Sequence, residues 1–196
     1  LALKSGETVL DVCAAPGGKT MQMALSGAEV TALDISAKRM ERVAENLTRT
    51  KLEADLVVAN VLDWQDARQF DAVLLDAPCS ATGTIRRHPD LPFAKDGTGI
   101  TELIRLQAEM LSAAAKRVRP GGRLVFCTCS LIPDEGEVHA ENFLDAHKDF
   151  VVDTMVPEGM EPEWRTQEGG YRLRPDYWAD RGGMDGFYII RMNRTT

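Results

Sequence analysis

Two short segments of the sequence place a cysteine directly after a run of strand-like residues. Residues 76–80 (DAPCS) contain Cys79, and residues 128–130 (TCS) contain Cys129. A cysteine reacts as its thiolate, and a free thiol with a pKa of about 8.5 is mostly protonated at neutral pH unless a nearby cation favours ionisation. Lys19 is the nearest cation in these motifs. We therefore expect nucleophilic catalysis by cysteine, with Asp76 as a carboxylate in the same pocket.

The alternative for each cysteine is a packing role, because buried cysteines commonly act as small hydrophobic side chains. We expect that role for Cys127, which lies within its strand and points to the same side as Cys129 by the period of two. Cys127 and Cys129 have the C-x-C spacing of some metal sites, but the chain has no second pair of cysteines with ligand spacing. His88, His139 and His147 are scattered along the sequence, so we expect no metal site. The chain has 4 cysteines, which fits free thiols in a reducing cytoplasm rather than a disulfide scaffold.

A glycine-rich loop, residues 11–20 (DVCAAPGGKT), joins another strand-like run to a helix. Its small residues let a ligand approach the backbone, and the helix N-terminus offers free N–H groups. The P-loop pattern fails because Cys13 stands where its first glycine is needed, and the dinucleotide pattern G-x-G-x-x-G is absent. Asp34 ends the next strand, where an acid suits ribose hydroxyls. We therefore expect a nucleoside cofactor without a long phosphate chain; the alternative is a tight structural turn with a solvated aspartate.

Strand-like runs alternate with amphipathic segments, and these elements must position the reactive residues. Strands are expected at residues 8–13, 29–34, 55–59, 71–76, 123–128, 150–155 and 187–192. Helices are expected at residues 18–27, 36–50, 100–118 and 134–147, with a polar loop from 77 to about 99 and a break at 120–122 (PGG). The alternation predicts an α/β fold with a parallel sheet covered by helices on both faces. Ligands of such sheets bind at the C-terminal strand ends, where polar residues follow the first five strands, so one site is predicted.

The composition is that of one globular domain. The chain has 196 residues, of which 44% are hydrophobic and 27% charged. No apolar run reaches the roughly 20 residues that span a bilayer, and no signal peptide opens the chain, so we predict a cytoplasmic protein without a membrane partner. The net charge of −7, taken alone, argues against a general polyanion binder.

Four motifs together resemble the RNA cytosine-5 methyltransferases of the Sun/Nop2/Fmu family. They are residues 10–20 (LDVCAAPGGKT), 74–90 (LLDAPCSATGTIRRHPD), 127–137 (CTCSLIPDEGE) and 185–189 (DGFYI). The match extends over essentially the whole chain, and the nearest similarity is to the bacterial type that methylates small-subunit ribosomal RNA. The resemblance implies a Rossmann-like methyltransferase fold, with a mostly parallel seven-stranded sheet, a final antiparallel strand and helices on both faces.

The resemblance also implies a reaction and a set of site residues. C5 of cytosine is a poor nucleophile, so the family adds a thiolate at C6, and Cys129 takes that role here. Asp76 would bind N3 and the exocyclic amine of cytosine, Cys79 would assist product release, and Lys19 is the fourth catalytic candidate. The residues expected to bind S-adenosylmethionine are Asp34, Arg39, Asn60, Asp76 and the loop residues Cys13, Ala14, Ala15, Pro16, Gly17, Gly18 and Lys19.

Two parts of the implied site depart from the family or extend it. Family members usually carry aspartate where this chain has Asn60, and Asp63 follows three residues later, so it stays open which of the two contacts the adenine side of the cofactor. Arg86 and Arg87 are the residues expected to bind RNA phosphates. Further candidates in the late loop are Arg165, Arg172, Arg174 and Arg181 as cations, and Tyr171, Tyr177 and Trp178 as stacking surfaces.

The family normally carries an N-terminal RNA-binding region ahead of the catalytic module, and Leu1 lies just before the first cofactor motif. We therefore expect residues 1–196 to form the catalytic methyltransferase domain of a longer protein, a monomer that acts on RNA and draws much of its phosphate affinity from elsewhere. Two alternatives stay open. A DNA cytosine-5 methyltransferase would use Cys79 as its nucleophile. A non-catalytic RNA-binding or ribosome assembly factor would keep the fold without the reaction.

Overall fold

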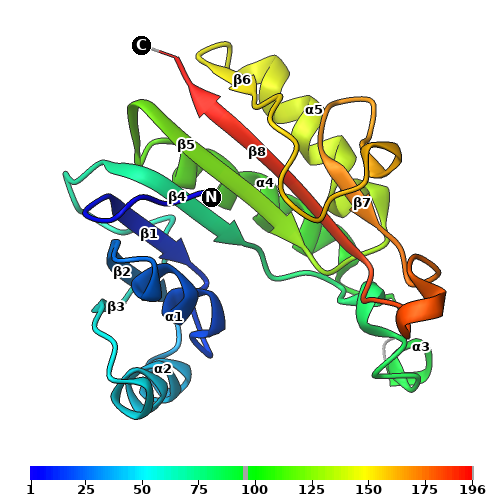
Figure 1. Cartoon of the computed structure of the whole chain (residues 1–196), viewed down its shortest axis with the longest axis horizontal. Helices are drawn as coiled ribbons and strands as arrows, with labels where there is room; N and C mark the ends of the chain where they lie inside the picture. Colours follow the sequence, from blue (N-terminus) through cyan, green and yellow to red (C-terminus); the bar gives the residue numbers. More distant parts are fainter. Residues whose placement is uncertain (95–96, 196) are drawn as a thin grey trace.

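The computed structural model describes residues 1–94 and 97–195, which form one sheet flanked by helices (Figure 1). The sheet order is β3-β2-β1-β4-β5-β8-β6, and β7 pairs with β8. The strands are β1 (Thr8–Val12), β2 (Glu29–Asp34), β3 (Asp55–Val58), β4 (Phe70–Asp76), β5 (Val118–Thr128), β6 (Phe150–Val152), β7 (Tyr171–Leu173) and β8 (Phe187–Arg194). The helices are α1 (Gly18–Leu25), α2 (Ala37–Thr50), α3 (Leu91–Ala94), α4 (Ile100–Ala115) and α5 (Glu137–Ala146). Four short 3-10 turns are η1 (Thr82–Thr84), η2 (Pro133–Glu135), η3 (Pro162–Trp164) and η4 (Ala179–Arg181).

The sheet combines a parallel half with an antiparallel end. Strands β1 to β5 pair in parallel, and β8 pairs antiparallel with β5, β6 and β7. This confirms the predicted α/β fold, a mostly parallel sheet whose last strand is antiparallel. The predicted number of seven strands is wrong, because the described residues form an 8-stranded sheet. The strand that the prediction lacks is β7, whose 3 residues are too few to show a periodic pattern.

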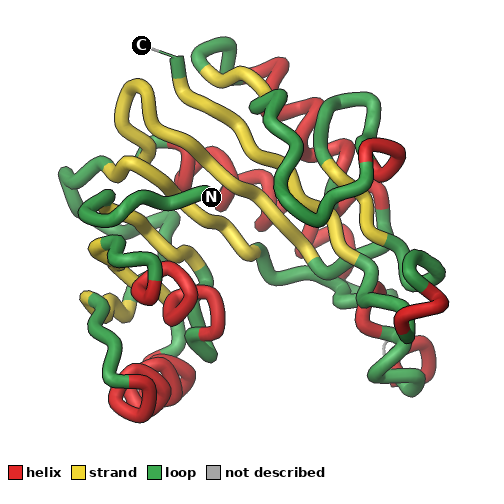
Figure 2. The backbone as a smooth tube through the Cα atoms, viewed as in Figure 1, coloured by secondary structure: helices red, strands yellow, loops and turns green. Residues whose placement is uncertain are grey.

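Helices cover both faces of the sheet. Leu10 of β1 belongs to the same hydrophobic cluster as Leu111 of α4, whereas the neighbouring Val9 packs in a second cluster with Met23 of α1. Because successive side chains of a strand point to opposite faces, α4 and α1 lie on opposite sides of the sheet. Helix α5 packs beside α4, and α2 packs beside α1. Figure 2 shows the two helical layers with the strands between them.

The helix boundaries agree with the sequence signals at some ends and not at others. Ser36 is the N-cap of α2, as predicted, and its side chain accepts a hydrogen bond from the N–H of Arg39 at 3.3 Å. Helix α4 ends at Ala115, earlier than predicted, because β5 already begins at Val118 and continues through the predicted break at residues 120–122. The predicted loop from 77 to 99 contains η1 and α3, and its residues 95 and 96 lie outside the described residues. Among the described residues, no helix combines the length and the apolar character needed to cross a membrane.

The loop after β4 and the start of β8 meet at two glycines. The N–H of Gly83 donates to the carbonyl of Cys129 at 2.9 Å, and the N–H of Gly186 donates to the carbonyl of Gly83 at 2.7 Å. A Cβ atom added at Gly83 would overlap the carbonyl oxygen of Gly186 and lie 2.9 Å from that of Cys129. Glycine is therefore required at position 83 because two backbone segments approach it closely.

We predict that Gly83→Ala lowers the free energy of unfolding by roughly 2–3 kcal/mol, because the added methyl group forces these segments apart. Gly18→Ala is the matched control, since a Cβ atom there meets nothing within 4 Å. Urea unfolding followed by circular dichroism compares the two variants. A Gly83→Ala protein with the urea midpoint of the unchanged chain would contradict the close contact.

Candidate active site

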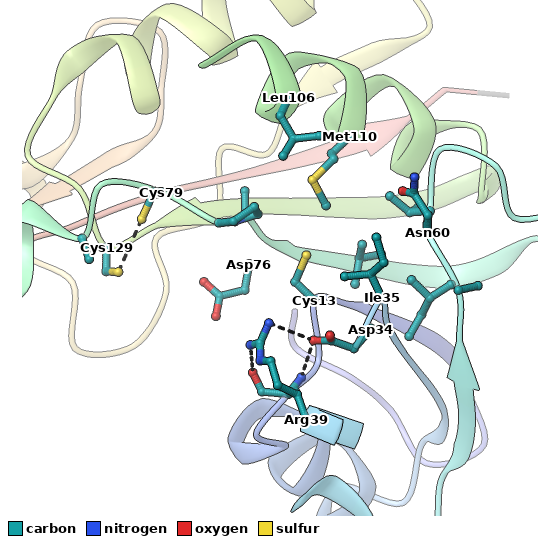
Figure 3. Close-up of a pocket in the computed structure, with 18 residues that line it drawn as sticks. Cys13, Asp34, Ile35, Arg39, Asn60, Asp76, Cys79, Leu106, Met110 and Cys129 are labelled. Atoms are coloured by element: carbon teal, nitrogen blue, oxygen red, sulfur yellow. Dashed lines mark hydrogen bonds and ion pairs between the residues drawn. The ribbon is translucent and has the colours of Figure 1, made fainter. Parts of the chain in front are cut away.

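A cavity of about 360 Å³ lies at the C-terminal ends of β1 to β5 (Figure 3). Parallel strands end at the same edge of a sheet, so the residues that follow them converge although they are far apart in sequence. Part of the wall is apolar, since the α4 side chains of Leu106 and Met110 cover one side. The predicted site residues that line this cavity are Cys13, Ala15, Asp34, Arg39, Asn60, Asp76, Cys79 and Cys129.

A second hollow of about 340 Å³ adjoins the cavity along the glycine-rich loop, and the two share Cys13, Ala15 and Asp76. The other predicted residues that line it are Ala14, Pro16, Gly18 and Lys19. Gly17 lines neither space. It is the N-cap of α1 with a φ of 99°, and a Cβ atom there would lie 3.1 Å from Cγ1 of Val43, so glycine lets the loop pass close to α2.

The sulfur atoms of Cys79 and Cys129 are 3.5 Å apart, within hydrogen-bonding distance for thiols. They meet because β4 and β5 are parallel neighbours in which Asp76 is paired with Cys127, and each cysteine follows within a few residues. The hydrogen bond from the Cys79 thiol lowers the pKa of Cys129 to about 7, against the opposing effect of burial. The same contact, together with burial, raises the pKa of Cys79. The two opposite shifts favour Cys129 as the thiolate of the pair and Cys79 as the thiol that donates the hydrogen bond to it.

Asp76 is surrounded by a cation and a third thiol. Its Oδ2 accepts a hydrogen bond from Nζ of Lys19 at 2.7 Å, and its Oδ1 accepts one from the buried thiol of Cys127 at 3.6 Å. Lys19, the nearest cation expected from the motifs, contributes to the lowered pKa of Cys129, but the hydrogen bond from Cys79 is the largest cause. Within residues 1–94 and 97–195, no group of three or more His, Cys, Asp or Glu side chains is placed to hold a metal ion.

Asp34 is 2% exposed and organises the loop at the other end of the cavity. Its carboxylate accepts hydrogen bonds from the N–H of Ala15 at 3.2 Å and of Ser36 at 3.0 Å. Nη1 of Arg39 lies 3.4 Å from Oδ2 of Asp34, while Nη2 of Arg39 donates to the carbonyl of Ala15 at 2.6 Å (Figure 3). The aspartate and the arginine thus fix the backbone of the glycine-rich loop against the start of α2.

Asn60 lines the cavity, whereas Asp63 is exposed outside it. Nδ2 of Asn60 donates to Oδ2 of Asp63 at 3.0 Å, and Oδ1 of Asn60 accepts the N–H of Leu62 at 3.1 Å. The second contact holds the turn after β3, and the first sets the orientation of the amide. Of the two residues left open by the sequence, Asn60 is the one that lines the cavity.

The arginines predicted to meet RNA are already paired with an aspartate. Arg87 lies 2.6 Å and Arg86 3.6 Å from the carboxylate of Asp185, just before β8. Their side chains stay about half exposed, at 53% and 43%, and neither lines the cavity. Two late-loop candidates have structural roles instead: Tyr171 is 5% exposed, and the side chain of Arg172 pairs with Glu137.

Several residues that matter for the site were not among the predicted ones. Leu106 and Met110 are four residues apart on α4, a spacing that puts them on one face of the helix, and Ile35 follows Asp34 directly. Glu135 in η2 is fully buried, although we expected it in the first turn of a helix at residues 134–147 and gave it no role in the site. The helical spacing was a signal for the first two, and the motif at residues 127–137, which contains Glu135, was a signal for the third.

Comparison with known proteins agrees with this arrangement. The family described as 16S rRNA methyltransferase RsmB/F matches residues 1–193. The chain is 39% identical over 201 residues to ribosomal RNA small subunit methyltransferase B of Shewanella oneidensis, covering 100% of this chain and 45% of that protein. It is 42% identical to the protein of the same name from Pseudomonas syringae pv. tomato, covering 98% of this chain and 44% of that protein.

Solved structures give the same answer for the fold. PH0851 superposes with a TM-score of 0.87 at 33% identity, covering 97% of this chain and 43% of that one. NSun6 from Pyrococcus horikoshii, solved with SFG, superposes with a TM-score of 0.84 at 27% identity, covering 99% of this chain and 49% of that one. The chain thus spans less than half the length of these relatives. By its match to the family over nearly its whole length, the chain belongs to the RsmB/F family of 16S rRNA methyltransferases.

Proposed function

We propose that the chain transfers a methyl group from S-adenosylmethionine to C5 of a cytosine in RNA, with small-subunit ribosomal RNA as the substrate. The observation that carries this proposal is the pair of thiols 3.5 Å apart, one with a lowered pKa, at the end of a cavity that also contains Asp76. The names of the relatives support the ribosomal substrate. In this proposal residues 1–196 are the catalytic methyltransferase domain.

The cavity fits a nucleoside cofactor. Its far end has the buried carboxylate of Asp34 and the amide of Asn60, polar groups suited to ribose hydroxyls and to a purine edge. Ile35 supplies an apolar surface between them, and the small side chain of Ala15 lines the loop side of the cavity. NSun6, solved with the S-adenosylmethionine analogue SFG, supports this use of the fold. When bound, S-adenosylmethionine supplies an electrophilic methyl group.

Cys129 performs the first covalent step in this mechanism. Its thiolate adds to C6 of cytosine, which forms a carbon–sulfur bond and moves the C5–C6 electron pair toward C5 and N3. C5 thereby becomes nucleophilic enough to accept a methyl group. Since the pKa of Cys129 is lowered to about 7, a large fraction of the enzyme carries the thiolate at neutral pH without a separate base.

Asp76 and Lys19 stabilise the adduct. The carboxylate of Asp76 accepts a hydrogen bond from the exocyclic amine of cytosine, which orients the ring beside Cys129. The ammonium of Lys19, 2.7 Å from Oδ2 of Asp76, keeps a positive charge next to the negative charge that develops at N3. The buried Cys127 thiol donates a hydrogen bond to Oδ1 of Asp76 and so helps to hold the carboxylate in its orientation.

Cys79 acts at the end of the reaction. The C5 proton passes to a solvent water molecule, and the electron pair of the broken C5–H bond forms the C5–C6 double bond and expels the Cys129 thiolate. Cys79 lies 3.5 Å from the departing sulfur and donates a hydrogen bond to it, so the leaving thiolate is stabilised as it forms. The hydrogen bond from Cys79 therefore stabilises the Cys129 thiolate twice, in the free protein and again when the thiolate leaves the product.

RNA approaches the open side of the site. Arg86 and Arg87 lie in the loop that carries Cys79, and a phosphate near the target would compete with Asp185 for them. A cytosine within a stacked strand cannot reach Cys129, so the target base leaves its stack before the reaction.

The two cysteines are expected to give opposite results when each is replaced. Cys79→Ala, mixed with ribosomal RNA and cofactor, should accumulate a covalent protein–RNA complex on denaturing gels, because addition still occurs and release is slow. Cys129→Ala should form none. The reverse pattern would assign the nucleophile to Cys79, as in a DNA cytosine-5 methyltransferase. If the full-length protein transfers no methyl group to any cytosine-containing RNA, a non-catalytic role is favoured.

The thiol contact predicts a pH dependence. The lowered pKa means that the Cys129 thiolate is present above about pH 7 and is lost as the pH falls through that value. Iodoacetamide labelling of Cys129, resolved by peptide mass spectrometry, should therefore show a midpoint near pH 7, which Cys79→Ala moves upward by at least one pH unit. Cys13, whose pKa is raised to about 12 by burial, is the internal control that stays unlabelled. A Cys129 midpoint that does not move in Cys79→Ala excludes the thiol donor.

Replacement of the buried acid should weaken cofactor binding. Asp34→Asn removes the charge that the Ala15 and Ser36 N–H groups and Arg39 share, so affinity for S-adenosylhomocysteine should fall roughly 10- to 100-fold by titration calorimetry. Glu41→Gln removes one charge from the exposed face of α2 and should leave the affinity unchanged. Equal affinities for the two variants would contradict the role of Asp34.

A further inference from the structure

We propose that Glu135 is a positioning residue that holds the two cysteine loops together and thereby keeps Cys79 in contact with Cys129. The inference deepens the proposed function and rests on it, since it explains how the reactive pair is kept in place. Glu135 does not line the cavity, so it acts through other residues rather than on a substrate.

Glu135 contacts the residue that follows Cys79. The N–H of Ser80 donates to its Oε1 at 2.9 Å, and the hydroxyl of Ser80 donates to its Oε2 at 2.5 Å. Nε2 of Gln107, from α4, donates to Oε1 at 2.9 Å and to the carbonyl of Pro78 at 2.8 Å. The residues on both sides of Cys79 are therefore tied to one carboxylate, directly on one side and through Gln107 on the other.

The same carboxylate is linked to the loop of Cys129. Oγ of Ser80 lies 3.1 Å from Oγ of Ser130, the residue that follows Cys129. On the other side of Cys129, the hydroxyl of Thr128 donates to the backbone carbonyl of Glu135 at 2.9 Å. The neighbours of both cysteines thus converge on Glu135, which spans the gap between the ends of β4 and β5.

The burial of this carboxylate is difficult to explain by stability alone. Glu135 is 0% exposed, and its hydrogen-bond partners Ser80, Gln107 and Ser130 are neutral. Burying a charge without an ion-pair partner is costly unless hydrogen bonds compensate for it. Here burial opposes ionisation, but the hydrogen bonds prevail and lower the pKa of Glu135, so the group is an acceptor for every donor around it.

The consequence for the thiols follows from the geometry. The contact of 3.5 Å between the sulfur atoms is one of several between the two loops. Beyond Ser80, the hydroxyl of Thr82 bonds to Ser130 and to the N–H of Leu131, and these bonds hold the part of the loop that follows the cysteine. If Ser80 loses its acceptor, the segment next to Cys79 loses a bond that these contacts do not replace, so the thiol is held less firmly against Cys129. The reactivity of Cys129 near neutral pH should then fall even though neither cysteine has been changed.

Glu135→Gln tests this inference in the intact chain, because glutamine keeps the shape but turns one acceptor into a donor facing Ser80. The readout is the iodoacetamide labelling of Cys129 as a function of pH, which requires no RNA. We expect the midpoint to rise by about one pH unit, so that labelling at pH 6 slows about tenfold. S-adenosylhomocysteine affinity should stay within about twofold, because Glu135 lies outside the cavity.

Asp134→Asn is the matched control, since this neighbouring carboxylate is exposed and its loss leaves the network intact. Ser80→Ala is the second variant if Glu135→Gln does not fold; it keeps the backbone N–H, removes the hydroxyl link to Glu135 and Ser130, and should shift the midpoint in the same direction. An unchanged labelling profile in the folded variants overturns the inference, as does an equal shift in Asp134→Asn. If the shift occurs but the full-length protein methylates no RNA, the proposed function fails while the positioning role of Glu135 stands.

Discussion

The contact between the sulfur atoms of Cys79 and Cys129 is the interaction on which the arrangement of the site depends. A thiol is a weak hydrogen-bond donor, so its effect on a neighbouring thiolate requires that both side chains stay in place. Three features hold them: the parallel register of β4 and β5, the glycine contact between positions 83 and 186, and the serines beside the cysteines. The sheet sets the coarse position, and the loop contacts set the distance.

The carboxylates around the cavity show how the charge of the site is balanced. Asp34 is paired with Arg39 and Asp76 with Lys19, so each acid beside the cavity has its own cation. Asp11 is not part of these two ion pairs. Burial raises the pKa of Asp11 to about 7, and the hydroxyl of Thr20 donates a hydrogen bond to its carboxylate at 2.5 Å. The region therefore stays close to neutral although the chain as a whole has a net charge of −7. Binding of a cationic cofactor beside a polyanionic substrate is compatible with such pairing.

The sequence predicted most of the fold because the strands are apolar runs that end in acids or thiols, and because parallel strands end at a common edge. For that reason Asp34, Asp76, Cys79 and Cys129, which the sequence puts at strand ends, all line one cavity. It did not predict that Lys19 pairs with Asp76 or that Asp185 holds Arg87, because spacing along the chain gives no side-chain distances. Strand β7 and the role of Glu135 depend on partners far away in sequence, such as Ser80 at 55 residues, and no local pattern reports those partners.

The most direct test of the account is to identify the cysteine that bonds to the base in the unchanged chain. RNA in which the target cytosine carries nitrogen at position 5 has no proton there to lose, so the thiol that adds to C6 remains attached. Proteolysis of the complex followed by mass spectrometry identifies the modified peptide and residue. We predict the nucleotide on Cys129, with Cys79 unmodified; a nucleotide on Cys79 would contradict the assignment of Cys129 as the nucleophile.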